Sequence, residues 1–313
     1  MKVLLITQYK ENIESNSVPD EQILIKHFKT YHLAVYNALL AKGHTVVVAS
    51  GLEYDLENKI VNSDVVFSIR HDFGFINSDV YIKLLAQKNR VNFVGNSSFS
   101  KFYDTDKIVG KILAENLKIR TPKYFLPYQI KKLRSKSPYI LKPRFSASSQ
   151  DIKDEYIFTD IGKLKNELDR QPRQDFFFIE KYINGITATI GCVLTKDDII
   201  CSDPYYLKSK SHRLITFEDK RSGNLKREYI KNKIIIDKMK RIARKYFLAI
   251  QPCQLARFDF ILTKLGKLYF LEVNTTPNLG TTNKFTGSFV KNYFASYENF
   301  IDYLVTSAID CNK

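Results

Sequence analysis

The sequence lacks the features that mark several common protein classes. Its four cysteines are scattered, without a CxxC pair, so neither a disulfide framework nor a zinc site is predicted. No run approaches the roughly 18 uncharged apolar residues that a membrane span needs, and the opening segment turns polar too soon for a signal peptide. The histidines lie in no recognisable Ser/His/Asp or Cys/His pattern. We therefore expect a cytoplasmic protein, and no Ser/His/Asp or Cys/His nucleophile is indicated.

Acidic residues are also scarce relative to basic ones. The chain carries 49 Lys and Arg against 33 Asp and Glu, a net charge of +16. The stretch from Tyr205 to Lys245 holds fourteen basic and four acidic residues, which is ten of those sixteen excess charges. This stretch could bind a polyanion such as nucleotide phosphates, nucleic acid or an acidic partner protein, or it could simply be a solvated helix face. No zinc-finger, RNP or basic-heptad pattern accompanies it, so sequence-specific nucleic-acid binding is disfavoured.

Hydrophobic patterning predicts an α/β region over the first hundred residues. Apolar strands alternate there with helices expected over residues 22–42 and 81–88, which favours a parallel sheet. The expected strands are Val3–Thr7, Thr45–Ser50, Asp64–Ile69 and Val91–Gly95.

The pattern changes to α+β beyond Thr105. After a helix to about Leu117, short strands become dense and are expected to form antiparallel or mixed sheets. They are Tyr139–Lys142, Phe176–Lys181, Thr187–Leu194, Ile199–Asp203, Cys253–Thr263 and Lys267–Val273. We predict three regions, namely an N-terminal domain (1–100), a central subdomain (101–184) and a C-terminal subdomain (185–313).

The last two of these strands form a hairpin with polar residues at period two. Arg257 and Asp259 share one face of the first strand. The second strand places three side chains on one face, those of Phe270, Glu272 and Asn274. With Leu265-Gly266 as a two-residue turn, Asp259 lies opposite Glu272, and Arg257 lies opposite Asn274. Leu265 suits such a turn poorly, and a bulge would shift the register by one.

Two opposed carboxylates repel each other unless a cation neutralises them. Carboxylate and amide oxygens are hard ligands, so Asp259, Glu272 and Asn274 predict a Mg²⁺ site, with Mn²⁺ as an alternative metal. An ordinary solvent-facing hairpin is the other interpretation, but the specific turn from Asn274 to Pro277 argues against it.

This hairpin resembles the metal-binding signature of the ATP-grasp superfamily, in its D-alanine:D-alanine ligase branch. Three other segments match in the right order: Asp106-Lys107 with Lys111 is similar to the lysine-bearing helix of the central domain, Tyr139–Pro143 to the phosphate-lysine strand, and Ile179–Gly185 to the adenine-reading hinge. Together they cover most of residues 96–285.

The resemblance implies an ATP-grasp architecture with an N-terminal Rossmann-like parallel-sheet domain. It also implies an enzyme that uses ATP to convert a carboxylate to an acyl-phosphate and passes the acyl group to an amine, or less commonly a thiol, releasing ADP and phosphate. The implied roles are metal binding by Asp259, Glu272 and Asn274; catalysis by Arg257, Lys220 and Ser148; and nucleotide binding by Lys107, Lys142, Glu180, Lys181, Ile183 and, at the ribose position, Thr187.

Several positions depart from the D-alanine:D-alanine ligase pattern. The loop from Arg144 to Asp151 has Ala147 and Asp151 where glycines are expected, although Ser148 is kept. Thr187 replaces an acidic residue, and Arg70–Gly74 stands where the branch has its His-Gly element. These departures argue against a D-alanine dipeptide as the product, although a D-alanine:D-alanine ligase proper and a non-catalytic nucleotide-binding module are kept as alternatives.

The substrates are left open. We expect small carboxylate and amine substrates, such as an amino acid or a peptide, and the basic stretch would suit an acidic carrier protein. Lys220 is the best match to the lysine of the family's mobile lid, with Lys208 and Lys210 as alternatives. A homodimer is compatible with the sequence, whereas a membrane or nucleic-acid partner is not expected.

Overall fold

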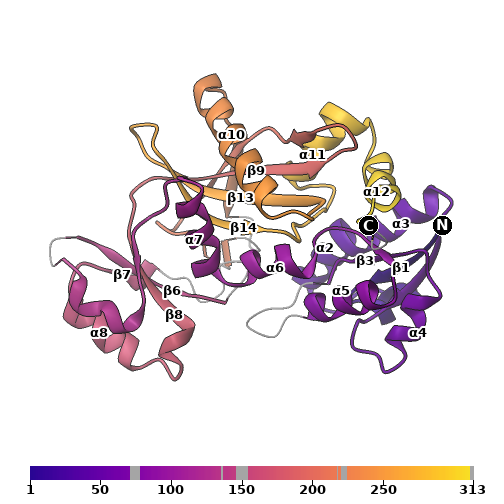
Figure 1. Ribbon diagram of the computed structural model, residues 1–313, viewed down its shortest axis with the longest axis horizontal. Helices are drawn as coiled ribbons and strands as arrows, with labels where there is room; N and C mark the ends of the chain where they lie inside the picture. The colour runs from indigo at the N-terminus through magenta and orange to yellow at the C-terminus, as the bar shows by residue number, and fades with distance from the viewer. Residues whose placement is uncertain (71–77, 135–136, 146–153, 217, 220–223, 311–313) are drawn as a thin grey trace.

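Three β-sheets follow one another along the chain and organise the molecule. The computed structural model describes residues 1–70, 78–134, 137–145, 154–216, 218–219 and 224–310. Figure 1 shows the N-terminal sheet on the right, a small sheet on the left and the third sheet with its helices above them. The parallel sheet followed by antiparallel sheets confirms the predicted fold class.

The N-terminal sheet is parallel, with the strand order β2-β1-β3-β4. Its strands are β1 (Lys2–Ile6), β2 (Thr45–Ala49), β3 (Val65–Ser68) and β4 (Asn92–Phe93). In β1, Val3 and Leu5 pack into one hydrophobic cluster and Leu4 and Ile6 into another, so the strand is buried on both faces. This explains its uninterrupted apolar run.

Helices cover both faces of this sheet. The helix predicted over residues 22–42 forms as three consecutive segments with a π-helical turn in the middle, and Gly43 ends it with φ +75°, as expected for a left-handed C-terminal cap. The helical segments here are α1 (Lys10–Glu14), α2 (Gln22–His27), η1 (Phe28–His32), α3 (Leu33–Ala41), α4 (Leu56–Val61) and α5 (Ser78–Lys88).

The small middle sheet is antiparallel, with the strand order β5-β8-β6-β7. Two helices lead into it, and the Asp106 side chain caps the second by accepting from the N–H of Ile108. The elements of this region are α6 (Ser98–Thr105), α7 (Lys107–Asn116), β5 (Tyr124–Phe125), η2 (Pro127–Lys132), β6 (Tyr139–Pro143), η3 (Asp154–Tyr156), β7 (Ile157–Phe158), α8 (Ile161–Asp169), η4 (Gln174–Phe176) and β8 (Phe177–Lys181).

The third sheet is the largest and has the order β12-β11-β9-β13-β14, with β10 paired to β9. Its strands are β9 (Ile186–Leu194), β10 (Ile199–Cys201), β11 (Tyr205–Ser209), β12 (Leu225–Tyr229), β13 (Leu255–Leu262) and β14 (Leu268–Asn274). Its helical segments are α10 (Lys233–Ala249), α11 (Lys284–Phe289), η5 (Val290–Phe294) and α12 (Tyr297–Thr306).

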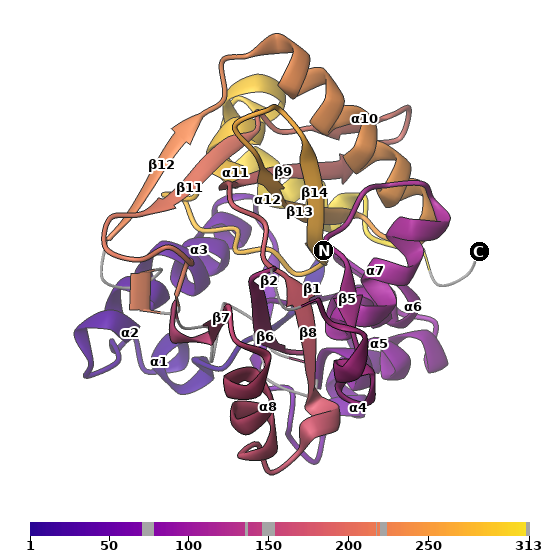
Figure 2. The ribbon, with the colours of Figure 1, turned by 90° about the vertical axis from the view of Figure 1, so that its left-hand side faces the viewer.

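Each face of the third sheet packs into a different core. Helix α10 covers one face through Met239, Ala243 and Phe247. Figure 2 shows this helix beside the strands of the sheet. On the other face, Phe285 and Phe300 of α11 and α12 join a cluster that also contains residues of β1 and α3. The C-terminal helices therefore fasten the third sheet to the N-terminal one.

Each of the three predicted regions holds one of these sheets, and the boundaries near residues 100 and 184 stay predictions. Among the described residues, no helix combines the length and the apolar character that crossing a membrane requires.

Gly191 in β9 lets α11 pack closely on the sheet. A Cβ atom at this position would approach two ring carbons of Phe285 to 2.2 and 2.4 Å. We expect Gly191→Ala to lower the free energy of unfolding by roughly 1–3 kcal/mol, because the buried ring would have to move. Urea denaturation measures this. As a control, Gly287→Ala in α11 meets no atom within 4 Å and should raise stability by about 0.5–1 kcal/mol; equal stabilities for the two variants would contradict the packing argument.

Candidate active site

The β13–β14 hairpin pairs its polar residues as predicted. Asp259 lies opposite Glu272, and Arg257 lies opposite Asn274. The predicted turn, however, is wrong. The loop contains three residues, with Gly266 at φ +71° and its N–H donating to the carbonyl of Thr263 (2.9 Å). A three-residue loop with glycine in the left-handed conformation avoids placing Leu265 in a type I′ turn.

A β-bulge restores the predicted pairing. The register shifts between Asp259 and Phe260, where Leu271 is the extra residue on β14. The bulge also turns Phe270 to the opposite face, where it is 1% exposed and stacks on Tyr246 of α10 (ring centroids 4.7 Å apart). The prediction that Phe270 shares a face with Glu272 is therefore wrong, because this aromatic ring is buried in the hydrophobic core on the other face of the sheet.

Asp259 is held by donors on two strands. The Arg257 side chain donates from Nε to Oδ1 (3.1 Å) and from Nη2 to Oδ2 (2.9 Å), and the Thr189 hydroxyl of β9 donates to Oδ1 (2.6 Å). The side chain of Asp259 is only 9% exposed. Burial disfavours the charge of Arg257, but Asp259 holds the pKa of this guanidinium above its usual value. Both charges are therefore fixed in position.

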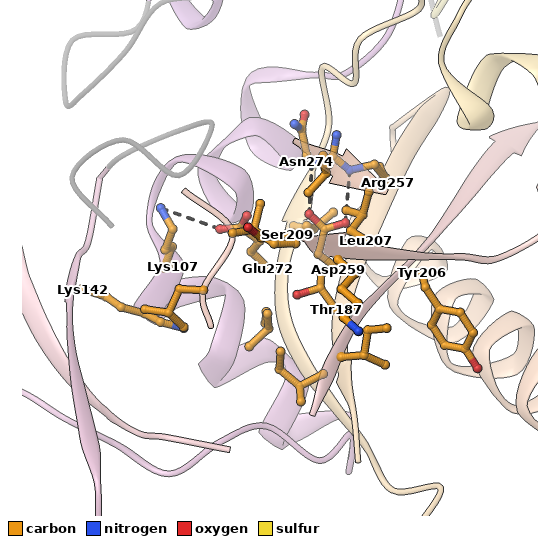
Figure 3. Close-up of a pocket in the computed structure, with 18 of the residues that line it drawn as sticks. Lys107, Lys142, Thr187, Tyr206, Leu207, Ser209, Arg257, Asp259, Glu272 and Asn274 are labelled. Atoms are coloured by element: carbon orange, nitrogen blue, oxygen red, sulfur yellow. Dashed lines mark hydrogen bonds and ion pairs between the residues drawn. The ribbon is translucent and has the colours of Figure 1, made fainter. Parts of the chain in front are cut away.

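Glu272 faces the opening of the site. Its side chain is 33% exposed, and Oε2 lies 3.7 Å from Nζ of Lys107, the first residue of α7 (Figure 3). Burial lowers the pKa of Lys107, against the opposing effect of Glu272. Beside them, Oδ1 of Asn274 accepts from the N–H of Thr276 (2.9 Å), which fixes the turn that follows β14.

The three predicted metal ligands thus share one surface of the hairpin. Two carboxylates and an amide oxygen suit a small hard cation such as Mg²⁺, which takes its other ligands from water and phosphate. No group of three His, Cys, Asp or Glu side chains able to hold a metal occurs in the described part of the chain. The amide oxygen of Asn274 has a second lone pair beyond its bond to Thr276. The residues therefore fit the metal, whose binding stays a prediction.

Two further lysines converge on Glu180 of β8. Lys111 of α7 lies 2.5 Å from one carboxylate oxygen of Glu180, and Lys142 of β6 pairs with the other. Glu180 is 2% exposed. Burial alone would raise its pKa, but the two lysines lower it, so the group is a carboxylate at neutral pH. This cluster joins α7 to the middle sheet beside the hinge.

Three of the four predicted hinge residues line a cavity that also contains the hairpin residues. Glu180, Ile183 and Thr187 line it, whereas the Lys181 side chain is exposed and is not among the described lining residues. The backbone N–H of Lys181 donates to the carbonyl of Lys123 (2.8 Å). The roles predicted for these residues stay predictions.

The cavity has a volume of about 1420 Å³ and is lined by residues of the middle and third sheets together with loop and helix residues of the N-terminal region. Lys107, Lys142, Thr187, Arg257, Asp259, Glu272 and Asn274 all line it, and Figure 3 shows them around one space. Of the alternatives for the lid lysine, Lys208 lines the cavity. Ser148 and Lys220 lie outside the described residues, as do positions 71–74 of the N-terminal departure. A cavity of this size accommodates a nucleotide together with a second substrate.

The sequence analysis did not predict a set of polar contacts that connects α6 to the turn after β14, next to the predicted metal ligands. Lys101 of α6 pairs with Asp104 (2.7 Å) and donates to the Thr276 hydroxyl (3.0 Å). Asp104 in turn accepts from the N–H and the hydroxyl of Thr275, each at 3.0 Å. The spacing of Lys101 and Asp104, three residues apart on a helix, was the available signal.

Known structures share this fold. The D-alanine–D-alanine ligase from Bacillus anthracis complexed with ATP has a TM-score of 0.72 at 17% identity, covering 97% of this chain and 96% of that one. The VanG D-Ala:D-Ser ligase from Enterococcus faecalis has a TM-score of 0.68 at 16% identity, covering 97% and 98%. The predicted ATP-grasp architecture is thereby confirmed.

Sequence comparison gives the family. The family model described as D-ala D-ala ligase C-terminus matches residues 127–306. The D-alanine–D-alanine ligase of Aquifex aeolicus is 26% identical over 267 residues, which is 79% of this chain and 84% of the relative. Because the family model alone spans more than half of the sequence, this chain belongs to the D-alanine–D-alanine ligase family, and the predicted ligase-class enzyme is confirmed.

Proposed function

We propose that the protein is an ATP- and Mg²⁺-dependent ligase that activates a substrate carboxylate as an acyl-phosphate and joins it to an amine. The observation that carries this proposal is the pairing of Asp259 with Glu272 on a cavity that also receives Lys107 and Lys142. Two carboxylates supply the metal ligands, and two lysines supply the phosphate contacts.

In the first step, an oxygen of the substrate carboxylate attacks the γ-phosphorus of ATP, and the bond to the β-phosphate oxygen of ADP breaks. The protein contributes position and charge, as phosphoryl transfer generally requires. We assign Asp259, Glu272 and Asn274 to the metal, which when bound neutralises charge on the phosphates. Lys107, with its ammonium 3.7 Å from Glu272, lies where it can contact the same phosphate group.

In the second step, the amine attacks the acyl carbon, the tetrahedral oxyanion collapses, phosphate leaves and the nitrogen loses a proton. Arg257 is the proposed donor to the oxyanion. Its two bonds to Asp259 hold the guanidinium plane in place before substrate arrives. Such preorganisation lowers the cost of stabilising charge in the transition state.

We place the adenine at the hinge between β8 and β9, where the main chain around Lys181 and Ile183 offers donors and acceptors. Glu180 is the proposed side-chain contact there. Its bonds to Lys111 and Lys142 keep it ionised and oriented, so it would act as an acceptor from the adenine amino group. Thr187 is proposed to contact the ribose.

The second candidate, a D-alanine:D-alanine ligase proper, is supported by the substrates in the names of the relatives. The Aquifex aeolicus protein is named for two D-alanines, whereas the fold is shared with an enzyme named for D-alanine and D-serine. The family therefore varies at the amine that it joins. We propose an amino acid or a short peptide as the acceptor.

The basic stretch from Tyr205 to Lys245 divides between the cavity and the outside of the molecule. Arg213 and Arg227 line the cavity, whereas Arg244 pairs with Asp198 (2.5 Å) at the surface. Lys245 donates to the carbonyl of Leu117 (2.6 Å). The members that line the cavity support a small anionic substrate as a ligand of this stretch.

Replacing Glu272 by glutamine tests the metal assignment. Glu272→Gln keeps the size of the side chain and removes its charge, so we expect ADP release to fall about 100-fold or more while the protein stays folded. Coupled ADP release at saturating Mg²⁺, with circular dichroism, measures both. Glu167→Gln on α8, whose side chain is 21% exposed and is not among the described residues that line the cavity, is the control and should keep full activity. Unchanged ADP release by Glu272→Gln would refute the assignment.

A panel of substrates separates the two candidate functions. Wild-type enzyme with ATP and Mg²⁺ is offered D- and L-amino acids singly and in pairs, and ADP release and product mass are recorded. We expect the best rate from a pair of different substrates, because Thr187 and the segment from Arg70 depart from the family pattern. Strong turnover with D-alanine alone would favour the D-alanine:D-alanine ligase instead.

A further inference from the structure

The turn that follows β14 is held by polar side chains from outside the third sheet. Thr275 and Thr276 come directly after Asn274, the last residue of this strand, and Thr275 is fully buried. Helix α6 packs against β14 and lies between α5 of the N-terminal region and α7, as Figure 1 shows. The contacts between α6 and the turn therefore link the N-terminal half of the chain to the predicted metal ligands.

Asp104, in the last turn of α6, binds Thr275 twice. Its Oδ2 atom accepts from the backbone N–H and from the hydroxyl of Thr275, each at 3.0 Å, and from Nζ of Lys101 at 2.7 Å. Burial alone would raise the pKa of Asp104, but Lys101 and Thr275 hold this pKa below its usual value, so the group is a carboxylate at neutral pH. A charged acceptor forms stronger hydrogen bonds than a neutral one, so the turn is firmly held.

Thr276 is held through its hydroxyl by two more donors. Nζ of Lys101 and Nδ2 of Asn96 both donate to Oγ1 of Thr276, each at 3.0 Å, and Asn96 also donates to the carbonyl of Thr275 (2.9 Å). The backbone N–H of Thr276 in turn donates to Oδ1 of Asn274 (2.9 Å). The hydrogen bonds thus run without a gap from α6 to one of the predicted metal ligands.

The orientation of the Asn274 amide depends on this turn. Within the described part of the chain, the bond from Thr276 is the one hydrogen bond that the Asn274 side chain makes, whereas Asp259 is held by Arg257 and Thr189. An amide binds a metal ion only through its oxygen, so its orientation must be fixed. Groups that orient a metal ligand by hydrogen bonding commonly affect metal affinity by about 10- to 100-fold.

We propose that Asp104 and Lys101 are positioning residues for metal binding: they fix the turn after β14, and the turn orients the amide oxygen of Asn274 toward a divalent cation. This inference rests on the proposed function. Neither residue contacts the metal in this arrangement, since both act through Thr275 and Thr276. A change at Asp104 should therefore weaken metal binding only while Asn274 is present.

Mn²⁺ binding tests this inference without knowledge of the amino acid substrates. Free Mn²⁺ is measured by EPR in titrations of the protein with a non-hydrolysable ATP analogue, and the analogue alone is the blank. We expect Asp104→Asn to raise the Kd for Mn²⁺ about tenfold or more, while the Kd for a fluorescent ATP analogue without metal stays within about twofold. Thr275→Val removes one bond to Asp104 but no charge, and should raise the Kd for Mn²⁺ roughly three- to tenfold.

Asp160→Asn is the matched control. Asp160 caps α8 by accepting from the N–H of Lys163 and is not among the described residues that line the cavity. Asparagine caps a helix about as well as aspartate, so this variant should change neither Kd. Thermal melting checks that every variant is folded, and Thr275→Val decides the question if Asp104→Asn does not fold.

A double-mutant cycle shows whether Asp104 acts through Asn274. In an Asn274→Ala background, Asp104→Asn should raise the Kd for Mn²⁺ by less than about twofold. The inference is overturned if Asp104→Asn leaves this Kd unchanged, or if it weakens binding equally with and without Asn274. If wild type binds no Mn²⁺ beyond the blank, the metal assignment in the proposed function fails, and the inference fails with it.

Discussion

The site depends on one constraint: two carboxylates, Asp259 and Glu272, lie side by side on adjacent strands and must both stay charged. Arg257 on one side and Lys107 on the other offset the electrostatic repulsion between these two carboxylates. Each cation comes from a different element, β13 and α7, so the arrangement exists only when the third sheet and the helix before the middle sheet are in contact. The two cations balance the two carboxylates, and we propose that the nucleotide phosphates bring the further negative charge that a bound metal ion requires.

The hydrophobic core determines this register more than the hairpin turn does. Phe270 must enter the core with Phe258 and Phe260, while Glu272, two residues later, must face the cavity. Strict alternation would put Phe270 and Glu272 on the same face. The bulge at Leu271 resolves the conflict by adding one residue. Packing of α10 on one face of the sheet therefore fixes the geometry of the predicted metal ligands on the other.

The sequence predicts local features well and long-range ones poorly. Period-two spacing placed Asp259 opposite Glu272, but two errors cancelled, since the three-residue loop and the bulge each shift the register by one. The hinge residue Glu180 was predicted from a resemblance, yet its burial between Lys111 and Lys142 depends on how α7 packs against β8, which no local pattern encodes. Arg227 was only one charge in a basic stretch, because its face depends on pairing between β11 and β12.

Strand β12 is also the outer edge of the third sheet, and its position has a consequence for association between chains. An exposed edge can recruit a strand from another molecule and start aggregation. Here Lys226 and Glu228 project from one face and Arg227 from the other, so an incoming strand would meet charges on both sides. Charged side chains on both faces of this edge therefore disfavour pairing with a strand of another chain.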